Sequence, residues 1–550
     1  MNSIDNLIDN LNKEQKEAVL NTEGPNLIVA GAGSGKTRVL TTRLIHIINQ
    51  KKTKDLNAFD FGDLILFCVK LFQENKDIKD IYNNNFKYIL VDEFQDTNFI
   101  QNKWLNLLVN KSQNICCVGD DDQSIYSWRG AEIKNFLTFD KIYSKCRVFK
   151  LEQNYRSTKN ILLTASNLIS NNSNRVGKKL WSSADQGELV KLNCYRTGKD
   201  EAQGISDIIE QKIKNKYSLN EVSILVRAIY QTREFEERFL QLGIGYRVLG
   251  GTKFYERAEI KDAVSYLRII NQKFDDLAFE RVIGVPKRGV GESTLNQIYA
   301  FGKNNKLCLE DSIIKMLERE DFKPKTKTTL KQFINMLQKW RKDSNNIKHY
   351  DLLKLVLDES GYSSMLKNKK DLENENRLEN LKELLRAMQD YDNLQSFLEH
   401  VALATSIDQE WDGAKITLMT MHAAKGLEFD VVFLPGWEEG LFPHQKSLEE
   451  KGDFALEEER RLAYVGITRA KKEAYLSFAM KRAFHGDWMD ALPSRFINEI
   501  PEESVEKNEI IVNDEEQFDF NQDSSIDFDE GYRSPGWDRY KKNKTLKWKK

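Results

Sequence analysis

The chain has 550 residues, of which 40% are apolar and 30% charged, which is the composition of a globular protein of roughly three or four domains. Its 83 Lys and Arg residues balance its 84 Asp and Glu residues, so net charge predicts no polyanion partner and any nucleic-acid surface must be local. None of the six cysteines has metal-site spacing and no apolar run is long enough to cross a membrane, so we expect a cytoplasmic protein without membrane contact.

The first predicted elements form a phosphate-binding pattern. A short apolar run at residues 27–30 predicts a strand, AGAGSGKT follows at residues 30–37, and apolar residues at helical spacing come next. This order brings backbone N–H groups and a helix N-terminus to phosphate oxygens. We therefore expect an ATP site formed by the loop and the residue after it, namely Ala30, Gly31, Ala32, Gly33, Ser34, Gly35, Lys36, Thr37 and Arg38.

The sequence YILVDEFQD at residues 88–96 predicts the second half of this site. An apolar run typical of a buried strand ends in two carboxylates, for which a solvated turn is the alternative interpretation. Beside a phosphate loop, Asp92 is expected to bind Mg²⁺ together with Thr37, while Lys36 reaches the β- and γ-phosphates. Glu93 could then orient and deprotonate the attacking water.

Later elements alternate in type along the chain. Apolar runs at residues 115–118, 222–226 and 431–434 predict further buried strands, and their alternation with helical stretches favours parallel sheets in an α/β fold. Residues 262–403 are helix-forming and poor in strand runs, which indicates a separate helical domain. Beyond Pro501, acidic clusters followed by a basic end predict a disordered tail.

Seven ordered segments of the sequence resemble the UvrD/Rep family of superfamily-one DNA helicases. They are LNKEQ (11–15), AGAGSGKT (30–37), VDEFQD (91–96), VGDDDQSIYSWRGA (118–131), LEQNYRS (151–157), LMTMHAAKGLEFDVVFLPG (418–436) and EEERRLAYVGITRA (457–470). The resemblance implies two RecA-like parallel-sheet domains that bind ATP between them, with a mainly helical domain inserted in the second. The implied ranges are 1–147 for the first domain with a truncated insert near 50–75, 148–249 and 411–500 for the second, 250–410 for the helical insert, and 501–550 for the tail.

The resemblance also implies roles for single side chains. It assigns six of them to the nucleotide: Gln15 to the adenine edge, Tyr155 to the base face, Glu428 to the ribose, and Gln123, Arg156 and Arg469 to the γ-phosphate. Two guanidinium groups at that position make physical sense, because fixed cations stabilise the charge that builds up on the transferred phosphoryl group.

Movement along a single strand needs a grip that does not depend on base sequence, and aromatic side chains that stack on bases provide one. Tyr126 and Trp128, with Arg129 beside them, are the candidates, and His422 in the family's fifth core motif is expected on the same track. Two aromatic residues alone are more typical of a core. These lie in a polar loop directly after Gln123, which would link hydrolysis to DNA contact.

One family segment has no counterpart in this chain. In the family, the helix after the phosphate loop leads to a strand, a motif of the T-F-T-N-K-A-A type and a DNA-binding insert, whereas here residue 50 is followed by KKTKD and LNAFDFGDLI. By pattern alone residues 64–69 could be a strand or a helix, and the comparison favours a helix. The missing strand would leave the strand before Asp92 at an exposed sheet edge.

Together these patterns predict an ATP-dependent 3′-to-5′ DNA helicase that uses Mg²⁺ and acts in repair or replication restart. Its expected partners are ATP, single-stranded and duplex DNA, and repair or replication proteins bound through the tail. An ATPase that responds to DNA without unwinding it is the main alternative, and an interaction protein with a vestigial phosphate loop is a third. The loop PKRGVGESTL at residues 286–295 could bring backbone amides to duplex phosphates or could be a plain turn.

Overall fold

The computed structural model describes residues 11, 16–17, 20, 61–143, 146–214, 217–368, 372–406, 413–484 and 487–509. The expected phosphate loop at residues 30–37, together with Gln15 and Arg38, lies outside the described residues. The chain divides into two compact units, Met1–Phe149 and Lys150–Lys550, called unit 1 and unit 2 below. Each unit contains a parallel sheet of its own.

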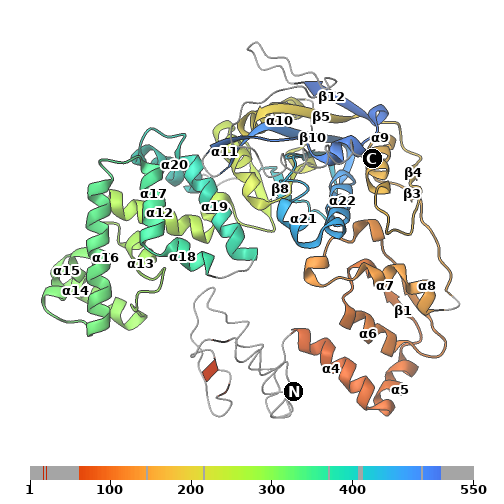
Figure 1. Cartoon of the computed structure of the whole chain (residues 1–550), viewed down its shortest axis with the longest axis horizontal. Helices are drawn as coiled ribbons and strands as arrows, with labels where there is room; N and C mark the ends of the chain where they lie inside the picture. The colour runs from red at the N-terminus through yellow and green to blue at the C-terminus, as the bar shows by residue number, and fades with distance from the viewer. Residues whose placement is uncertain are drawn as a thin grey trace, which may run out of the picture. The chain divides into compact units, whose positions relative to one another are not determined.

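The described part of unit 1 is a small α/β arrangement (Figure 1). Its elements are α4 (Phe61–Glu74), α5 (Lys76–Asn85), β1 (Ile89–Val91), η2 (Phe94–Asp96), α6 (Phe99–Leu108), β2 (Ile115–Cys117), η3 (Asp121–Gln123), η4 (Ser127–Arg129), α7 (Ile133–Leu137) and α8 (Phe139–Ile142). Residues 64–69 lie inside α4, so the helix favoured by the family comparison is confirmed. Asn98 begins α6 with a capping box, in which its side chain accepts from the Gln101 N–H and the Gln101 side chain accepts from the Asn98 N–H.

The strands of unit 1 are more exposed than the sequence predicts. The strands predicted at residues 88–91 and 115–118 are confirmed as β1 and β2. Their predicted burial is wrong, because Tyr88 and Leu90 are 73% and 80% exposed and Val118 after β2 is 52% exposed. Within the described part of unit 1, β1 pairs in parallel with β2 and with no other strand. A pair of strands is fully buried only when other elements pack on both of its faces, and the apolar residues of the strands do not show whether such elements are present.

Unit 2 is built around an eight-stranded sheet. Its strands lie in the order β12-β5-β10-β9-β6-β8-β7, with β11 added to β10, and every ladder is parallel except β10–β11. The strands are β5 (Val190–Thr197), β6 (Val222–Val226), β7 (Tyr246–Leu249), β8 (Ile416–Thr420), β9 (Phe429–Leu434), β10 (Ala470–Phe484), β11 (Asp487–Asp490) and β12 (Val505–Glu509), preceded by a separate parallel pair of β3 (Gln153–Asn154) and β4 (Trp181–Ser182). All five residues of β6 are buried, and β9 contains the predicted run 431–434, so both predicted strands are confirmed.

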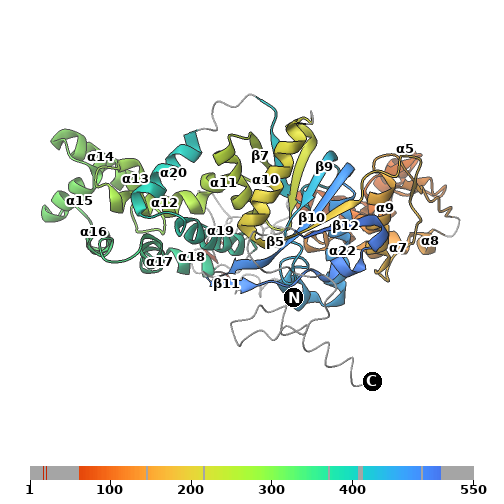
Figure 2. The same ribbon diagram turned by 90° about the horizontal axis from the view of Figure 1, so that it is seen from above.

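Helices cover both faces of this sheet. Figure 2 shows α10 (Gly198–Lys214) and α11 (Thr232–Leu242) on one face, and α9 (Lys159–Ser170) and α22 (Asp453–Ile467) on the other. The short helix α21 (Gln445–Lys451) packs against α22. One core cluster joins α10 and α11 to the sheet, and it draws on residues as distant in sequence as Ala202 and Tyr475. The two sequence halves of unit 2 therefore fold as one layered body.

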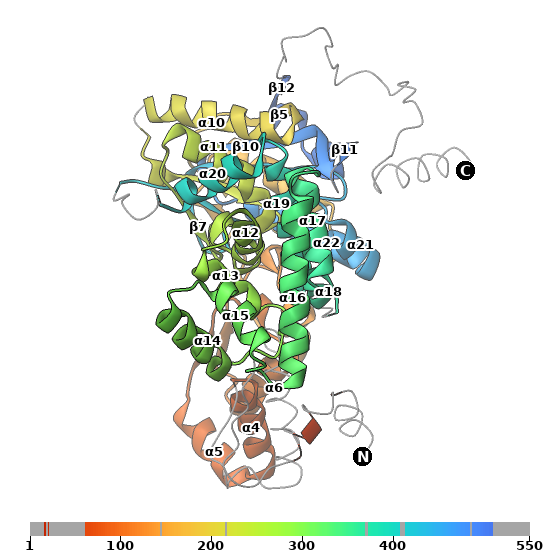
Figure 3. The same ribbon diagram turned by 90° about the vertical axis from the view of Figure 1, so that its left-hand side faces the viewer.

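A run of helices lies between two neighbouring strands of the sheet. Strands β7 and β8 pair directly, yet the chain between them forms nine α-helices within the described residues. These are α12 (Ala258–Asn271), α13 (Asp276–Ile283), α14 (Glu292–Asn305), α15 (Leu309–Glu318), α16 (Pro324–Asp343), α17 (His349–Glu359), α18 (Tyr362–Lys367), α19 (Leu372–Met388) and α20 (Leu394–Ser406). They share a core of buried side chains from Phe254 to Ala404 and stand in front of the sheet in Figure 3. The predicted class, a parallel α/β sheet with a helical insertion, is confirmed.

The segment after Pro501 differs from the predicted tail at its beginning. Residues Val505–Glu509 form β12, which pairs in parallel with β5 at the edge of the sheet. The acidic residues of this stretch are not typical of a strand, and for this reason the sequence does not predict the strand at the sheet edge. Over the part of the chain that the structure covers, no helix combines the length and the apolarity that a membrane span requires.

Candidate active site

Two carboxylates follow β1, where the parallel strand ends at its carboxyl edge. Asp92 is exposed, and its Oδ1 accepts the backbone N–H of Glu93 at 2.9 Å. Glu93 has a left-handed backbone with φ of 48°, which is uncommon for a residue other than glycine and turns the chain sharply out of the strand. The predicted pair of acids is therefore held side by side in a tight turn.

Gln95 joins the turn after β1 to the turn after β2. Its side chain is fully buried, its Nε2 donates to Glu93 Oε2 at 2.5 Å, and its Oε1 accepts the Asp120 N–H at 3.0 Å. A Cβ atom added to Gly119 would overlap Gln95 Oε1, so glycine at this position lets the two turns approach. Sequence reasoning missed Gln95, because nothing in its local pattern separates a buried bridge from a solvated amide.

Gln123 extends this bridge. Its Nε2 donates to Asp120 Oδ2 at 2.8 Å, while Asp120 Oδ1 accepts the Asp122 N–H at 2.9 Å. Glu93, Gln95, Asp120 and Gln123 thus form a continuous hydrogen-bonded chain. The structure brings together the predicted catalytic base and the predicted γ-phosphate sensor, which come from two different strands.

The aromatic pair that follows Gln123 lies partly at the surface. Trp128 is 52% exposed, its ring centroid lies 6.4 Å from that of Tyr126, and the planes are inclined by 62°. The Arg129 guanidinium carbon lies 4.5 Å from the centre of the Trp128 ring and 5.4 Å from that of Tyr126. These three predicted DNA contacts form one cationic aromatic cluster instead of a buried core.

In unit 2, three distant segments meet beside the start of β10. Arg156 donates from Nε to Glu428 Oε2 at 2.7 Å and from Nη1 to the Thr468 carbonyl at 3.4 Å. Tyr155, next to Arg156, is 83% exposed and donates its hydroxyl to Gln153 at 2.9 Å. The predicted ribose and phosphate contacts, Glu428 and Arg156, therefore meet although they lie far apart in the sequence.

Glu428 has a second cationic neighbour that sequence reasoning missed. Lys471 lies 2.9 Å from Glu428 Oε1, and the hydrogen bonds from Lys471 and Arg156 hold the pKa of the Glu428 carboxyl below its usual value. Lys471 occurs at an irregularity in the pairing of β10 with β9, between Ala470 and Glu473. The ion pair of Lys471 with Glu428 occurs at this register shift, which no local sequence pattern predicts.

Arg469 is held differently from Arg156. Its side chain is 2% exposed and donates to the Val465 carbonyl at 3.0 Å, the Leu427 carbonyl at 3.1 Å and the Thr468 hydroxyl at 3.2 Å. Thr468 contacts both arginines, so the two lie at one turn.

His422 and the loop at residues 286–295 complete the predicted sites. His422 is half-buried in the turn after β8. This turn lies beside the turn after β7, as shown by the distance of 3.4 Å between the Ala423 Cβ and a Cβ atom built on Gly250. Arg288 is buried, donates to the Val282 carbonyl and to the Tyr266 hydroxyl, and covers the Phe333 ring. Its side chain stabilises the turn internally, so the Arg288 guanidinium is not presented to a phosphate.

Comparison with known proteins agrees with this arrangement. The UvrD-like helicase C-terminal domain matches residues 149–481, and the UvrD/REP helicase N-terminal domain matches residues 11–56 and 50–144. A probable DNA helicase II homolog of Rickettsia conorii is 45% identical over 464 residues, which cover 84% of this chain and 71% of that protein. The ATP-dependent DNA helicase PcrA of Bacillus subtilis is 43% identical over 476 residues, covering 83% of this chain and 63% of the relative.

The comparisons also bear on the segment without a counterpart. PcrA of Staphylococcus epidermidis is 33% identical over 643 residues, which is longer than this whole 550-residue chain, so that relative carries residues that this chain lacks. The N-terminal family match is broken into two stretches that meet at residues 50–56, where the motif comparison predicts the gap. From the two family matches and the identities above, this chain belongs to the UvrD/REP helicase family.

Proposed function

We propose that this chain is an ATP-dependent DNA helicase that moves 3′-to-5′ along single-stranded DNA in repair or replication restart. Relatives named DNA helicase II and PcrA support an ATP-dependent helicase. The observation that carries the proposal is the convergence of Arg156, Glu428 and Arg469 at one turn of unit 2. Such a cluster of fixed cations suits the charge that develops on a transferred phosphoryl group.

The residues proposed to bind the nucleotide occur in both sequence ranges, 1–149 and 150–550. Lys36 and the other loop residues cradle the phosphates, and Glu93 activates the attacking water while Gln123 responds to the γ-phosphate. Gln15 and Tyr155 hold the adenine, and Glu428 binds the ribose. The hydrogen-bonded chain from Glu93 through Gln95 to Gln123 supports this assignment, because it connects the proposed base to the proposed sensor.

Mg²⁺ is the proposed cofactor, held by Asp92 and Thr37. Of these two residues, the structure describes Asp92. Its carboxylate suits a metal ion, because it is exposed and one of its oxygens is oriented by the Glu93 N–H. Oxygen donors of this type are what Mg²⁺ prefers. The ion would neutralise phosphate charge during hydrolysis.

The proposed DNA track comprises Tyr126, Trp128, Arg129 and His422. Stacking on exposed aromatic rings is worth about 1–3 kcal/mol per base and tolerates any base. The half-exposed Trp128 and the guanidinium above it support this role. Because Tyr126 follows Gln123 by three residues, a change at the γ-phosphate would move the stacking loop.

The proposed domains follow from the sheet and its insertion. They are 1–147 for the first RecA-like domain, 148–249 and 411–500 for the second, and 250–410 for the helical insert. The strand Val505–Glu509 extends the second domain beyond residue 500. The remaining tail is a proposed contact for repair or replication proteins.

A second candidate function is a DNA-responsive ATPase that does not unwind. The broken N-terminal family match and the longer relative favour it, because the absent segment corresponds to a single-strand contact surface in the family. In this alternative, the ATP site works while the grip on DNA is too weak for strand displacement.

One experiment separates these candidates. ATP hydrolysis with and without single-stranded DNA is measured beside strand displacement of duplexes with 3′ or 5′ overhangs. We expect DNA-stimulated hydrolysis and unwinding from the 3′ overhang, and Glu93→Gln should lower both roughly a hundredfold or more. Glu132→Gln, an exposed carboxylate of the same unit, is the control.

The outcomes are distinct. Stimulated hydrolysis without displacement supports the second candidate and excludes unwinding. A folded wild-type protein that neither hydrolyses ATP nor displaces a strand would contradict both candidate functions. Unwinding from the 5′ overhang alone would contradict the proposed direction.

A further inference from the structure

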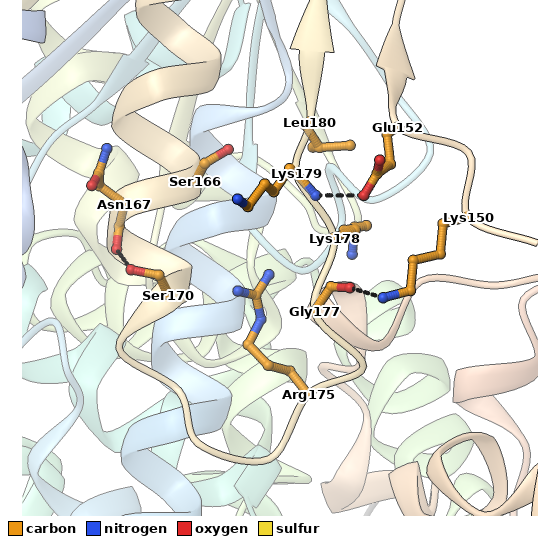
Figure 4. Close-up of a pocket in the computed structure, with 10 residues that line it drawn as sticks. All are labelled: Lys150, Glu152, Ser166, Asn167, Ser170, Arg175, Gly177, Lys178, Lys179 and Leu180. Atoms are coloured by element: carbon orange, nitrogen blue, oxygen red, sulfur yellow. Dashed lines mark hydrogen bonds between the residues drawn. The ribbon is translucent and has the colours of Figure 1, made fainter.

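A basic hollow of about 680 Å³ lies on the surface of unit 2 (Figure 4). Its walls are the end of α9, the loop that follows α9, and the segment that leads into β3. The lining residues are Lys150, Glu152, Ser166, Asn167, Ser170, Arg175, Gly177, Lys178, Lys179 and Leu180. Glu152 is the one lining residue that belongs to a family motif, LEQNYRS at residues 151–157, and no lining residue is assigned to the nucleotide or to the aromatic DNA track.

Positive charge dominates the hollow, with four cationic side chains against the single carboxylate of Glu152. Lys150 Nζ donates to the Gly177 carbonyl at 2.5 Å and to the Val176 carbonyl at 3.4 Å, which are neutral acceptors, so its charge is retained. Glu152 Oε1 accepts the backbone N–H of Lys179 at 2.8 Å. In a chain whose net charge is −1, this is a local excess of cations.

The polar side chains Asn167 and Ser170, which α9 contributes to the wall of the hollow, already donate hydrogen bonds within the helix and are not needed to bind an anion. The Ser170 hydroxyl donates to the Asn167 carbonyl at 2.6 Å, and Asn167 Nδ2 donates to the Leu163 carbonyl at 3.0 Å. Lys179 is exposed and forms no ion pair with any residue that the structure describes. An incoming anion would therefore meet the ammonium groups of Lys150 and Lys179.

The lining also limits what the anion can be. It contains no aromatic side chain, so it offers no platform for stacking a base, and Leu180 is its one large apolar member. Mobile lysines and an arginine around an open surface hollow suit a chain of phosphates. A single buried anion would instead require a closed site with convergent donors.

We propose that this hollow binds the sugar-phosphate backbone of DNA without regard to base sequence. The proposal rests on the proposed function, since it adds a second DNA contact to the same enzyme. Lys150 and Glu152 lead directly into β3, whose partner β4 is tied to this segment by the Trp181 N–H, which donates to the Glu152 carbonyl at 2.9 Å. Tyr155 and Arg156 follow β3, so the DNA contact and the nucleotide contacts share one short stretch of backbone.

The test compares Lys179→Ala and Lys179→Glu with Lys354→Ala and Lys354→Glu in the full chain. Lys354 is an exposed lysine of α17 in the same unit, remote from the lining of the hollow. Binding of a fluorescent 20-nucleotide single strand and of a duplex is followed by anisotropy at several salt concentrations. Thermal unfolding checks that each variant is folded.

We expect the Lys179 variants to weaken binding severalfold, more for Glu than for Ala, while the Lys354 variants match wild type. Loss of one phosphate contact should reduce the salt slope by about 0.9 for duplex and about 0.7 for single strands, which identifies the form of DNA that occupies the hollow. Basal hydrolysis of ATP without DNA should stay unchanged.

Two results would overturn the proposal. They are an unchanged dissociation constant and slope in Lys179→Glu, and an equal loss in Lys354→Glu. Failure of the proposed function has a different signature, because the wild type would then lack DNA-stimulated hydrolysis altogether.

Discussion

Arg156 and Arg469 illustrate how differently two arginines can be held at one turn. The Arg156 side chain is 32% exposed and is oriented by the carboxylate of Glu428, whereas Arg469 is buried and oriented by two carbonyls and a hydroxyl. A guanidinium that is paired at the surface can leave its partner for a phosphate at little cost. The buried one is fixed in place before the nucleotide arrives.

This difference predicts separate consequences for the two residues. Arg156→Ala should lower kcat for ATP hydrolysis roughly a hundredfold or more, with little change in melting temperature, because a cation at the transferred phosphoryl group is lost. Arg469→Ala should lower both kcat and the melting temperature, because the carbonyls that it satisfies are left without a donor. Steady-state kinetics and thermal unfolding measured together check this.

Lys159→Ala provides a control nearby, since Lys159 begins α9 shortly after Arg156 in the chain. Equal melting temperatures for both arginine variants would contradict the structural part of the prediction. Full turnover in Arg156→Ala would contradict the catalytic part.

Among the elements, the attachment of the helical insertion rests on buried ion pairs. Arg233 of α11 donates to Glu383 of α19 at 2.6 Å, and their side chains are 2% and 6% exposed. Burial alone would raise the pKa of Glu383, but Arg233 and Arg386 beside it hold that pKa below its usual value. This contribution to stability is therefore present above the unfolded-state pKa of the carboxyl and is lost as pH falls through the folded-state pKa.

We expect Glu383→Ala to destabilise the protein by on the order of 3 kcal/mol, because it leaves the buried Arg233 short of a carboxylate partner. Lys382→Ala breaks a pair whose side chains are each 33% exposed and should cost less than about 1 kcal/mol. Melting temperatures at pH 7 and pH 4 measure the effect. The difference between Glu383→Ala and wild type should shrink at the lower pH, and an equal difference at both would refute the electrostatic origin.

At the scale of the whole molecule, the chain combines two units of unequal construction. The described sheet of unit 1 has two strands of three residues each, whereas unit 2 has an eight-stranded sheet and a separate helical core. Cooperative unfolding is expected within each unit, because the chain divides into two compact units. The expected phosphate loop belongs to the chain segment of unit 1.

Calorimetry should therefore resolve two unfolding transitions. A non-hydrolysable ATP analogue with Mg²⁺ should raise the midpoint of the unit 1 transition, with a stabilisation of about 2.7 kcal/mol at a ligand concentration a hundred times the dissociation constant. Lys36→Ala should abolish this shift without changing the midpoint measured in the absence of nucleotide. A single transition, or an equal shift in Lys36→Ala, would contradict this organisation.

The sequence by itself determined the features that depend on near neighbours along the chain. The run 222–226 is a buried strand, the insertion is helical, and the ordered motifs identify the family. Helical periodicity and apolar runs are set by residues within a few positions of one another, so they can be read locally.

Only the tertiary structure decided how these parts meet. It buried Gln95 between two turns, turned Arg288 inward, exposed Leu90, placed Lys471 beside Glu428 and added Val505–Glu509 to the sheet edge. Each of these depends on strand order and on layers contributed by residues far away in sequence. Burial and ion pairing are properties of the packed molecule, and the same local pattern is compatible with a surface or a core until that packing is known.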